Sequence, residues 1–233
     1  MKTWITHKGT RITRILPGRS NVFMIETGGK RILVDTSAAF TRKMLHRRLR
    51  KTGVSTLDFL ILTHTHFDHC GNAEYIRTLT GAKICVHPAE AEFLAKGSGP
   101  LPAGTVWLTR TLLRIPLPSG AAFFKTSPCK PDFLTENNRL PEGFPTNIGI
   151  IHTPGHSPGS LCVTVDNEIA LTGDTLFGVF PGNCFPPFAD DTKTLIKSWE
   201  ILLQTDCRLF LPSHGMARPR KTLERSYKKY SRN

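Results

Sequence analysis

Three imidazoles and a carboxylate lie within six consecutive positions of the segment LILTHTHFDHCGN: His64, His66, Asp68 and His69. Imidazole and carboxylate are the usual nitrogen and oxygen ligands of zinc and similar divalent ions. So many ionisable groups close together cost desolvation energy unless something pairs with them. The run before them, residues 57–63, is mostly apolar and predicts a buried strand that delivers the four side chains at its end.

Three more ligand-type residues follow predicted strands, as His64 does. They are His156 after NIGIIHT, Asp174 after EIALTG and His214 after RLFLPS. Strand ends at one sheet edge can gather in space, so these distant side chains could meet in one cleft. A set of histidines and aspartates without thiolate favours a catalytic divalent-metal site. Five histidines and two aspartates exceed the needs of one tetrahedral ion and fit two ions better.

The elements that must position these residues are strands followed by helices, and this succession is predicted twice along the chain. Such a repeat suits two halves, each a sheet with its helices, packed into one layered domain that covers residues 1–233. From Gly97 to Pro145 regularity fades, and eight of the 17 prolines lie there, so this stretch is expected to be a lid-like loop. The predicted strands are 10–16, 21–27, 31–36, 57–63, 82–86, three within 147–177, and 207–215; the predicted helices are 40–51, 68–80, 88–96, 191–205 and about 217–233.

The bulk composition narrows the class of protein. The chain has 233 residues, 39% of them hydrophobic, and no stretch approaches the roughly 20 apolar residues of a membrane span. Its N-terminus lacks the apolar core of a secretory signal. The six cysteines are scattered without a C-x-x-C pair, a pattern typical of reduced thiols. We therefore expect a soluble, cytoplasmic protein that does not use a membrane; its oligomeric state is not predicted.

The formal net charge of +13 is concentrated in residues 40–51 and 217–233. Such charge can attract an anionic substrate, a nucleic acid or a membrane surface. It can equally belong to solvated helix faces, and charge patterning favours that simpler interpretation.

At the seven ligand-type residues the sequence resembles the metallo-β-lactamase superfamily, from about Ser20 to Gly215. The resemblance is carried by the H-x-H-x-D-H motif of residues 64–69 and by TPGHSPGS, TGDT and PSHG. It implies an α/β fold, an αββα sandwich with a two-metal site at its edge. It also implies that His64, His66 and His156 hold one ion, that Asp68, His69 and His214 hold the other, and that Asp174 bridges them. Zinc is expected, and iron or manganese would suit the same ligands.

The resemblance also implies a metal-dependent hydrolase. A water shared by two divalent cations loses its proton near neutral pH and becomes a bridging hydroxide nucleophile. One cation then polarises the substrate oxygen and takes up the charge that develops. Asp68, which orients the hydroxide, and Asp174 are the expected catalytic residues.

Within the superfamily, TGDTLF and the histidine motif are most similar to glyoxalase II. The run Gly215-Met216-Ala217 departs from the Glu-Tyr-Thr run of that branch. True β-lactamases of this pattern lack a bridging aspartate, so Asp174 distinguishes the chain from them. Flavodiiron proteins have glutamate where this chain has His66, and the acyl-homoserine lactonases have tyrosine where it has Phe177. The preferred function is hydrolysis of a thioester, ester or lactone in a small, anionic substrate.

Two other function classes stay open. A nucleic-acid-processing phosphodiesterase would use the same two ions for phosphoryl transfer, and the positive charge would suit a polyanion. A binding protein without catalysis ranks last, because all seven ligands are present.

Gly155-His156-Ser157-Pro158-Gly159 also matches G-x-S-x-G, the nucleophile elbow of serine hydrolases. We reject that interpretation because Pro158 lacks the N–H that an oxyanion hole needs. The segment that follows also predicts a strand and not a helix. The remaining histidines match no ligand position: His7, His46, His87 and His152.

Overall fold

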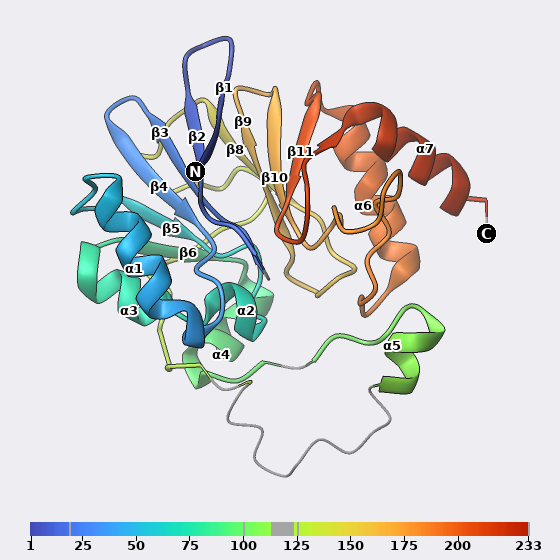
Figure 1. Ribbon diagram of the computed structural model, residues 1–233, viewed down its shortest axis with the longest axis horizontal. Coiled ribbons are helices and arrows are strands. Elements are labelled where there is room, and N and C mark those ends of the chain that lie inside the picture. Colours follow the sequence, from blue (N-terminus) through green and yellow to red (C-terminus); the bar gives the residue numbers. More distant parts are fainter. Residues whose placement is uncertain (19, 100, 113–123, 125, 233) are drawn as a thin grey trace.

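The computed structural model describes residues 1–18, 20–99, 101–112, 124 and 126–232. Two β-sheets face each other and helices cover their outer faces (Figure 1). This αββα arrangement confirms the fold predicted from the sequence.

The first sheet contains seven strands in chain order. The first four are antiparallel, and the remaining strands run parallel to β4. Helices α1, α3 and α4 lie on its outer side (Figure 1). Its strands are β1 (Lys2–Ile5), β2 (Arg11–Leu16), β3 (Val22–Thr27), β4 (Lys30–Val34), β5 (Phe59–Ile61), β6 (Lys83–Val86) and β7 (Phe133–Leu134), and its helices are α1 (Arg42–Lys51), α3 (Ala73–Thr80) and α4 (Pro88–Lys96).

The second sheet has five strands in the order β12-β11-β10-β9-β8, covered by α6 and α7. Strands β10 and β11 are parallel, whereas β8 and β10 each pair antiparallel with β9. The elements are β8 (Ile148–His152), β9 (Leu161–Val165), β10 (Ile169–Gly173), α6 (Thr192–Gln204), β11 (Leu209–Pro212), β12 (Arg218–Pro219) and α7 (Arg220–Tyr230).

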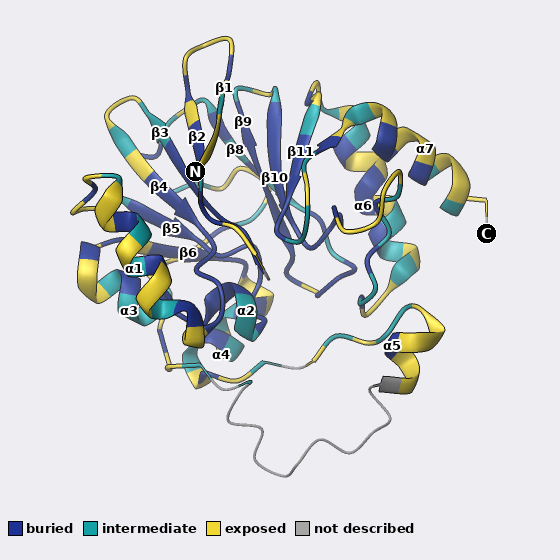
Figure 2. Ribbon diagram, viewed as in Figure 1, coloured by how far each residue is buried: buried dark blue, intermediate teal, exposed yellow. Residues whose placement is uncertain are grey.

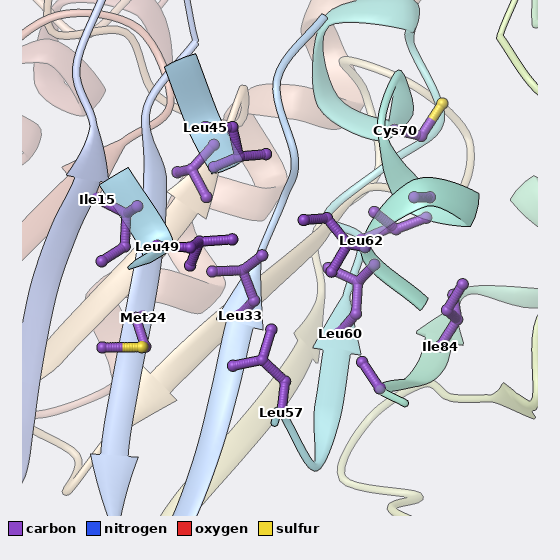
Figure 3. Packing of buried hydrophobic residues seen from close by; sticks show 14 of the residues in the cluster. Ile15, Met24, Leu33, Leu45, Leu49, Leu57, Leu60, Leu62, Cys70 and Ile84 are labelled. Atoms are coloured by element: carbon purple, nitrogen blue, oxygen red, sulfur yellow. The ribbon is translucent and has the colours of Figure 1, made fainter. Parts of the chain in front are cut away.

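Three apolar layers hold the sandwich together: one between the sheets and one under each helical layer. Buried positions follow the inner faces of strands and helices (Figure 2). On α1, Leu45 and Leu49 lie four residues apart on one helix face, and both pack against the first sheet, next to Ile15 and Leu33 (Figure 3). Burial of the apolar face therefore explains why so basic a helix is stable here.

The direction of the strands brings the ligand-type residues to one edge. Strands β4 and β5 are parallel, as are β10 and β11, so each pair ends at the same edge of its sheet. Strand β8 runs in the same direction as β10 because both are antiparallel to β9. The segments after β5, β8, β10 and β11 therefore leave the sandwich on one side.

The helix predicted over 68–80 is in fact two helices, α2 (Phe67–Cys70) and α3. A Cβ atom at Gly71 would collide with the backbone of Ala39 and Phe67, so the chain passes too closely here for any other residue. The Asn72 side-chain amide donates to the carbonyl oxygens of Thr36 and Ala38, both at 2.9 Å. Tertiary contacts with the loop after β4 therefore interrupt the helix.

The described part of the segment expected to be irregular, 97–145, contains two short elements. Helix α5 (Trp107–Leu112) and strand β7 lie within it, and a 3₁₀ turn (Ala39–Thr41) precedes α1. Residues 100, 113–123 and 125 of the predicted lid lie outside the described residues. None of the helices in the described ranges combines the length and apolar character needed to cross a bilayer.

Candidate metal centre

All seven ligand-type residues predicted from the sequence come together at one edge of the sandwich. Their potential ligand atoms form three overlapping groups, and within each group the atoms lie within 4.8 Å of one another. The groups are His64, His66 and His156; His64, His69 and Asp174; and Asp68, His69 and His214.

Asp174 lies between the other ligands. Its Oδ1 is 3.4 Å from His69 Nε2, and its Oδ2 is 3.4 Å from His156 Nε2 and 3.2 Å from His214 Nε2. His66 Nδ1 and His156 Nε2 approach to 2.9 Å. His156 belongs to the first of the three groups, and His69 and His214 belong to the third. We call these two the outer groups, and the Asp174 carboxylate faces imidazoles from both.

The centre opens to solvent on the side of Asp68 and His214. Their side chains are 14% and 16% exposed, and His214 Nε2 lies 3.5 Å from Asp68 Oδ2. The other five ligand-type residues are buried. A substrate would therefore approach from this side.

Several of these buried ligand atoms lack a hydrogen-bond partner. They are Nε2 of His64, His66 and His69, and Oδ1 of Asp174. Buried polar atoms are normally hydrogen-bonded, so unpartnered ones that converge on one point need another partner. Nitrogen and carboxylate donors without thiolate fit a divalent cation such as zinc. The residues present therefore fit the metal ions expected from the sequence.

The protonation states also suit metal binding. Burial and the neighbouring imidazoles hold the pKa of His64 and His66 well below the usual range, so both rings are neutral, as ligands must be. Burial alone would raise the pKa of Asp174, but His214, His69 and His156 bring it well below its usual range. Burial lowers the pKa of His69, but Asp174, Asp35 and Asp68 outweigh it and raise the pKa well above normal. The three carboxylates therefore favour a positive charge at His69, which a second ring proton or a bound cation can supply.

The family model of the metallo-beta-lactamase superfamily matches residues 15–214. The chain belongs to this superfamily.

Relatives agree with this assignment. The chain is 30% identical over 176 residues to an uncharacterized protein of Mycobacterium leprae, covering 72% of this chain and 74% of that protein. It is 27% identical over 172 residues to the human acyl-coenzyme A thioesterase MBLAC2, covering 68% of this chain but only 59% of that protein. A metallo-β-lactamase structure from Cronobacter sakazakii superposes with a TM-score of 0.68 at 16% identity, covering 100% of this chain and 96% of that one; this likeness shows the fold alone.

Asp35 is a buried carboxylate that the sequence interpretation missed. Its Oδ2 lies 2.9 Å from His69 Nδ1, so that nitrogen carries the proton and Nε2 is left for a ligand bond. Thr63 donates its N–H and its hydroxyl to Asp35, and the hydroxyl oxygen lies 3.1 Å from His64 Nδ1. Asp35 thus orients two ligand rings, one directly and one through Thr63. The available signal was a carboxylate at the end of the predicted strand at 31–36, at the same sheet edge.

A glycine gives Asp174 its direction. Gly173 has φ +51°, in the left-handed region that favours glycine. A Cβ there would lie 2.8 Å from the Thr63 side chain. The sharp turn after β10 therefore depends on a residue without a side chain.

Aromatic and backbone groups hold the remaining histidines. Phe177 stacks on His214 with ring centroids 4.8 Å apart. His156 Nδ1 lies 2.9 Å from the Phe188 carbonyl oxygen, so Nδ1 carries the proton and Nε2 is the unprotonated nitrogen. Gly104 forms an antiparallel bridge with Phe188, so the segment before α5 pairs with the loop behind His156. The position where lactonases carry tyrosine therefore supports a ligand in this chain.

Ser157 is placed as a structural residue. It is buried, and its hydroxyl donates to Glu90 Oε1 at 2.6 Å. The chain continues into β9, a strand, as the sequence predicted. The four other histidines lie outside the three ligand groups: His7 pairs with Glu168, His46 is hydrogen-bonded to Tyr75, and His87 stacks on His152.

Proposed function

We propose that this superfamily member is a binuclear metal-dependent hydrolase, glyoxalase II-like in its site, that cleaves a thioester, ester or lactone. The observation that carries the proposal is the position of Asp174. One carboxylate within 3.4 Å of imidazoles from both outer groups suits a ligand shared by two cations. Zinc is the proposed metal, because the donors are imidazole and carboxylate.

When bound, two divalent ions would supply a deprotonated bridging water as nucleophile and a Lewis acid for the substrate oxygen. The chain's own residues do the rest. The rings of His64, His69 and His156 are fixed by hydrogen bonds at Nδ1, which leaves Nε2 of each ring unprotonated. Asp68, at the open side, would accept a hydrogen bond from the attacking water and orient it toward the substrate carbonyl.

A thioester is the favoured substrate. The similarity of TGDTLF to glyoxalase II supports this choice, and so does the printed activity of the human relative, an acyl-coenzyme A thioesterase. The formal charge of +13 favours a small, anionic substrate of this kind. The chain spans 59% of that relative's length, so its activity is carried over only as a proposal.

The basic face of α1 favours a second candidate, a nucleic-acid phosphodiesterase. A shallow hollow of about 520 Å³ lies on this face, and none of its lining cations forms an ion pair with a carboxylate of the described residues. A row of unpaired cations is a suitable contact for phosphates. The lining residues are Lys43, His46, Arg47, Arg50 and Lys51.

The test combines metal analysis with a substrate panel. We expect two zinc ions per chain and loss of activity on chelation that added zinc restores. An acyl-coenzyme A, a hydroxyacyl-glutathione, an aryl ester, a lactone and an aryl phosphodiester would be compared by kcat/KM. The expected result is a thioester preference of at least about a hundredfold over the phosphodiester, equivalent to about 2.7 kcal/mol in transition-state stabilisation.

Two results would overturn the proposal. Full activity with one ion or fewer would exclude a binuclear mechanism. A phosphodiester preference, with nucleic-acid affinity that falls about a thousandfold between 50 and 200 mM salt, would favour the second candidate.

A further inference from the structure

Glu90 is a buried carboxylate outside the seven ligand-type residues. It is 2% exposed, and it forms no ion pair with a cationic side chain of the described residues. Burying a carboxylate without a cation is costly unless several donors hydrogen-bond to it. Its donors therefore indicate what the carboxylate does.

The two oxygens of Glu90 bind two different loops. Oε2 accepts from the N–H of Thr65 at 3.0 Å and from its hydroxyl at 2.5 Å. Oε1 accepts from the Ser157 hydroxyl at 2.6 Å and from the Gly159 N–H at 3.1 Å. Thr65 lies between His64 and His66, and Ser157 follows His156 directly. One side chain thus joins the loops that carry the group of three histidines.

The helix start and the neighbouring loop both allow Glu90 to make these hydrogen bonds. His87 caps α4 by accepting the Ala89 N–H at Nδ1, at 3.1 Å, and Pro88 begins the helix. Glu90 therefore lies in the first helical turn, where the helix dipole stabilises a negative charge. A Cβ atom at Gly159 would collide with the Glu90 side chain, so only glycine permits the loop to approach so closely.

We propose that Glu90 is a positioning residue that sets the separation of these two loops and thereby the affinity of the His64–His66–His156 position for its cation. Its hydrogen bonds end on Thr65, Ser157 and Gly159, so the position formed by Asp68, His69 and His214 does not depend on it. This inference rests on the proposed metal-dependent function.

Glu90→Gln is a sharp test because all four partner groups donate to the carboxylate. A glutamine side chain offers one oxygen and one NH₂ group. Whichever way the amide turns, its NH₂ faces a backbone N–H, either that of Thr65 or that of Gly159. The backbone of one of the two loops therefore loses its hydrogen bond to residue 90, while the volume of the side chain is preserved.

The measurement is a Co²⁺ titration of metal-free protein followed by absorption. Reference spectra come from His156→Ala, which removes a ligand of the three-histidine position, and from His214→Ala, which removes one of the other. Glu92→Gln is the matched control, because Glu92 lies on the same helix and pairs with the exposed Lys96.

In Glu90→Gln, we expect the ion at the three-histidine position to bind about 10- to 100-fold more weakly, the usual effect of losing a residue that supports metal ligands. The other ion keeps its affinity, so the first Co²⁺ bound gives the spectrum seen in His156→Ala. Glu92→Gln behaves as wild type.

Unchanged affinity at the three-histidine position, or an equal loss at both positions, would overturn the proposal, because a general loss of stability weakens both. If Glu90→Gln does not fold, Thr65→Val removes one hydroxyl donor and must weaken the same ion selectively, by several-fold. A wild type that binds one ion would overturn the binuclear function separately. The Glu90 proposal would then be decided on that ion: weaker binding in Glu90→Gln than in Glu92→Gln supports it, and unchanged affinity overturns it.

Discussion

Asp35 and Glu90 are both buried carboxylates beside the candidate metal centre, but they contact it in different ways. Asp35 contacts a ligand ring directly, through His69 Nδ1, and reaches His64 through Thr63. It also accepts from the Ser213 hydroxyl at 3.1 Å, next to His214. Glu90 touches no ligand ring and binds only groups in the loops between and after the ligands. Asp35 orients imidazole rings, whereas Glu90 holds two loops at a fixed separation.

This difference predicts different consequences for the two metal positions. Asp35 serves His64 and His69, which belong to different outer groups, so its loss should affect both ions. Glu90 serves only the loops of the three-histidine group. On this proposal, Asp35 supports both metal positions, and Glu90 supports the three-histidine position alone.

The largest effect is expected for Asp174→Ala, which removes the group common to both positions. Turnover should fall by roughly a thousandfold or more, and at most one ion should remain bound. Metal-free protein should keep its melting temperature within a few degrees, because the site lies at the edge of the sandwich. Kinetics, metal analysis and thermal unfolding check this.

Asp58→Ala is the control for that variant. Asp58 lies at the opposite end of β5, where it pairs with Lys30 at 2.8 Å. This substitution should leave metal content and turnover unchanged. A wild-type rate in Asp174→Ala would show that Asp174 has no part in the mechanism. It would also exclude Asp174 as a ligand shared by two metal positions.

An intermediate effect is expected for Asp35→Asn. The amide keeps one acceptor oxygen, so its NH₂ group must face a donor, either the Thr63 N–H or His69 Nδ1. Both ions should bind about 10- to 100-fold more weakly, as measured by Co²⁺ titration. Weakening of one ion alone would show that Asp35 is not a shared support.

The gathering of the seven ligand-type residues could be predicted from the sequence because metal chemistry restricts residue type and strand ends restrict position. His64, His156, Asp174 and His214 each follow a predicted strand, and parallel strands end at one edge. The αββα fold predicted from the same motifs is confirmed by the structure and by the family match.

The supporting carboxylates could not be found in the same way. Asp35 reaches its partners 28 and 34 residues along the chain, and Glu90 reaches Ser157 across 67 residues. Nothing in the local pattern of PAEAEFLAK distinguishes Glu90 from the half-exposed or exposed positions around it. The break between α2 and α3 was missed for the same reason, since the contact of Gly71 with Ala39 appears only in the folded chain.

The smallest effect is expected for Ser157→Ala. The hydroxyl supplies one of the four hydrogen bonds to Glu90, and Gly159 still donates to the same carboxylate oxygen. Loss of one such bond costs about 1.5–3 kcal/mol when the acceptor is charged, and the remaining donors limit the movement of the loop. We expect less than a tenfold loss of kcat and a several-fold weaker ion at the three-histidine position only.

Ser226→Ala provides the matched control for this last variant. Ser226 is a buried serine on α7 whose hydroxyl accepts from the Cys184 N–H at 3.1 Å, so the same substitution removes one hydrogen bond away from the centre. It should lower the melting temperature slightly without changing either ion's affinity. A loss of several orders of magnitude in kcat for Ser157→Ala, with both ions bound, would instead make Ser157 a nucleophile. The interpretation of G-x-S-x-G as an elbow would then return, although Pro158 still has no N–H to offer an oxyanion. A small effect confined to one ion would place Ser157 with Glu90, as part of the support that spaces the two histidine loops.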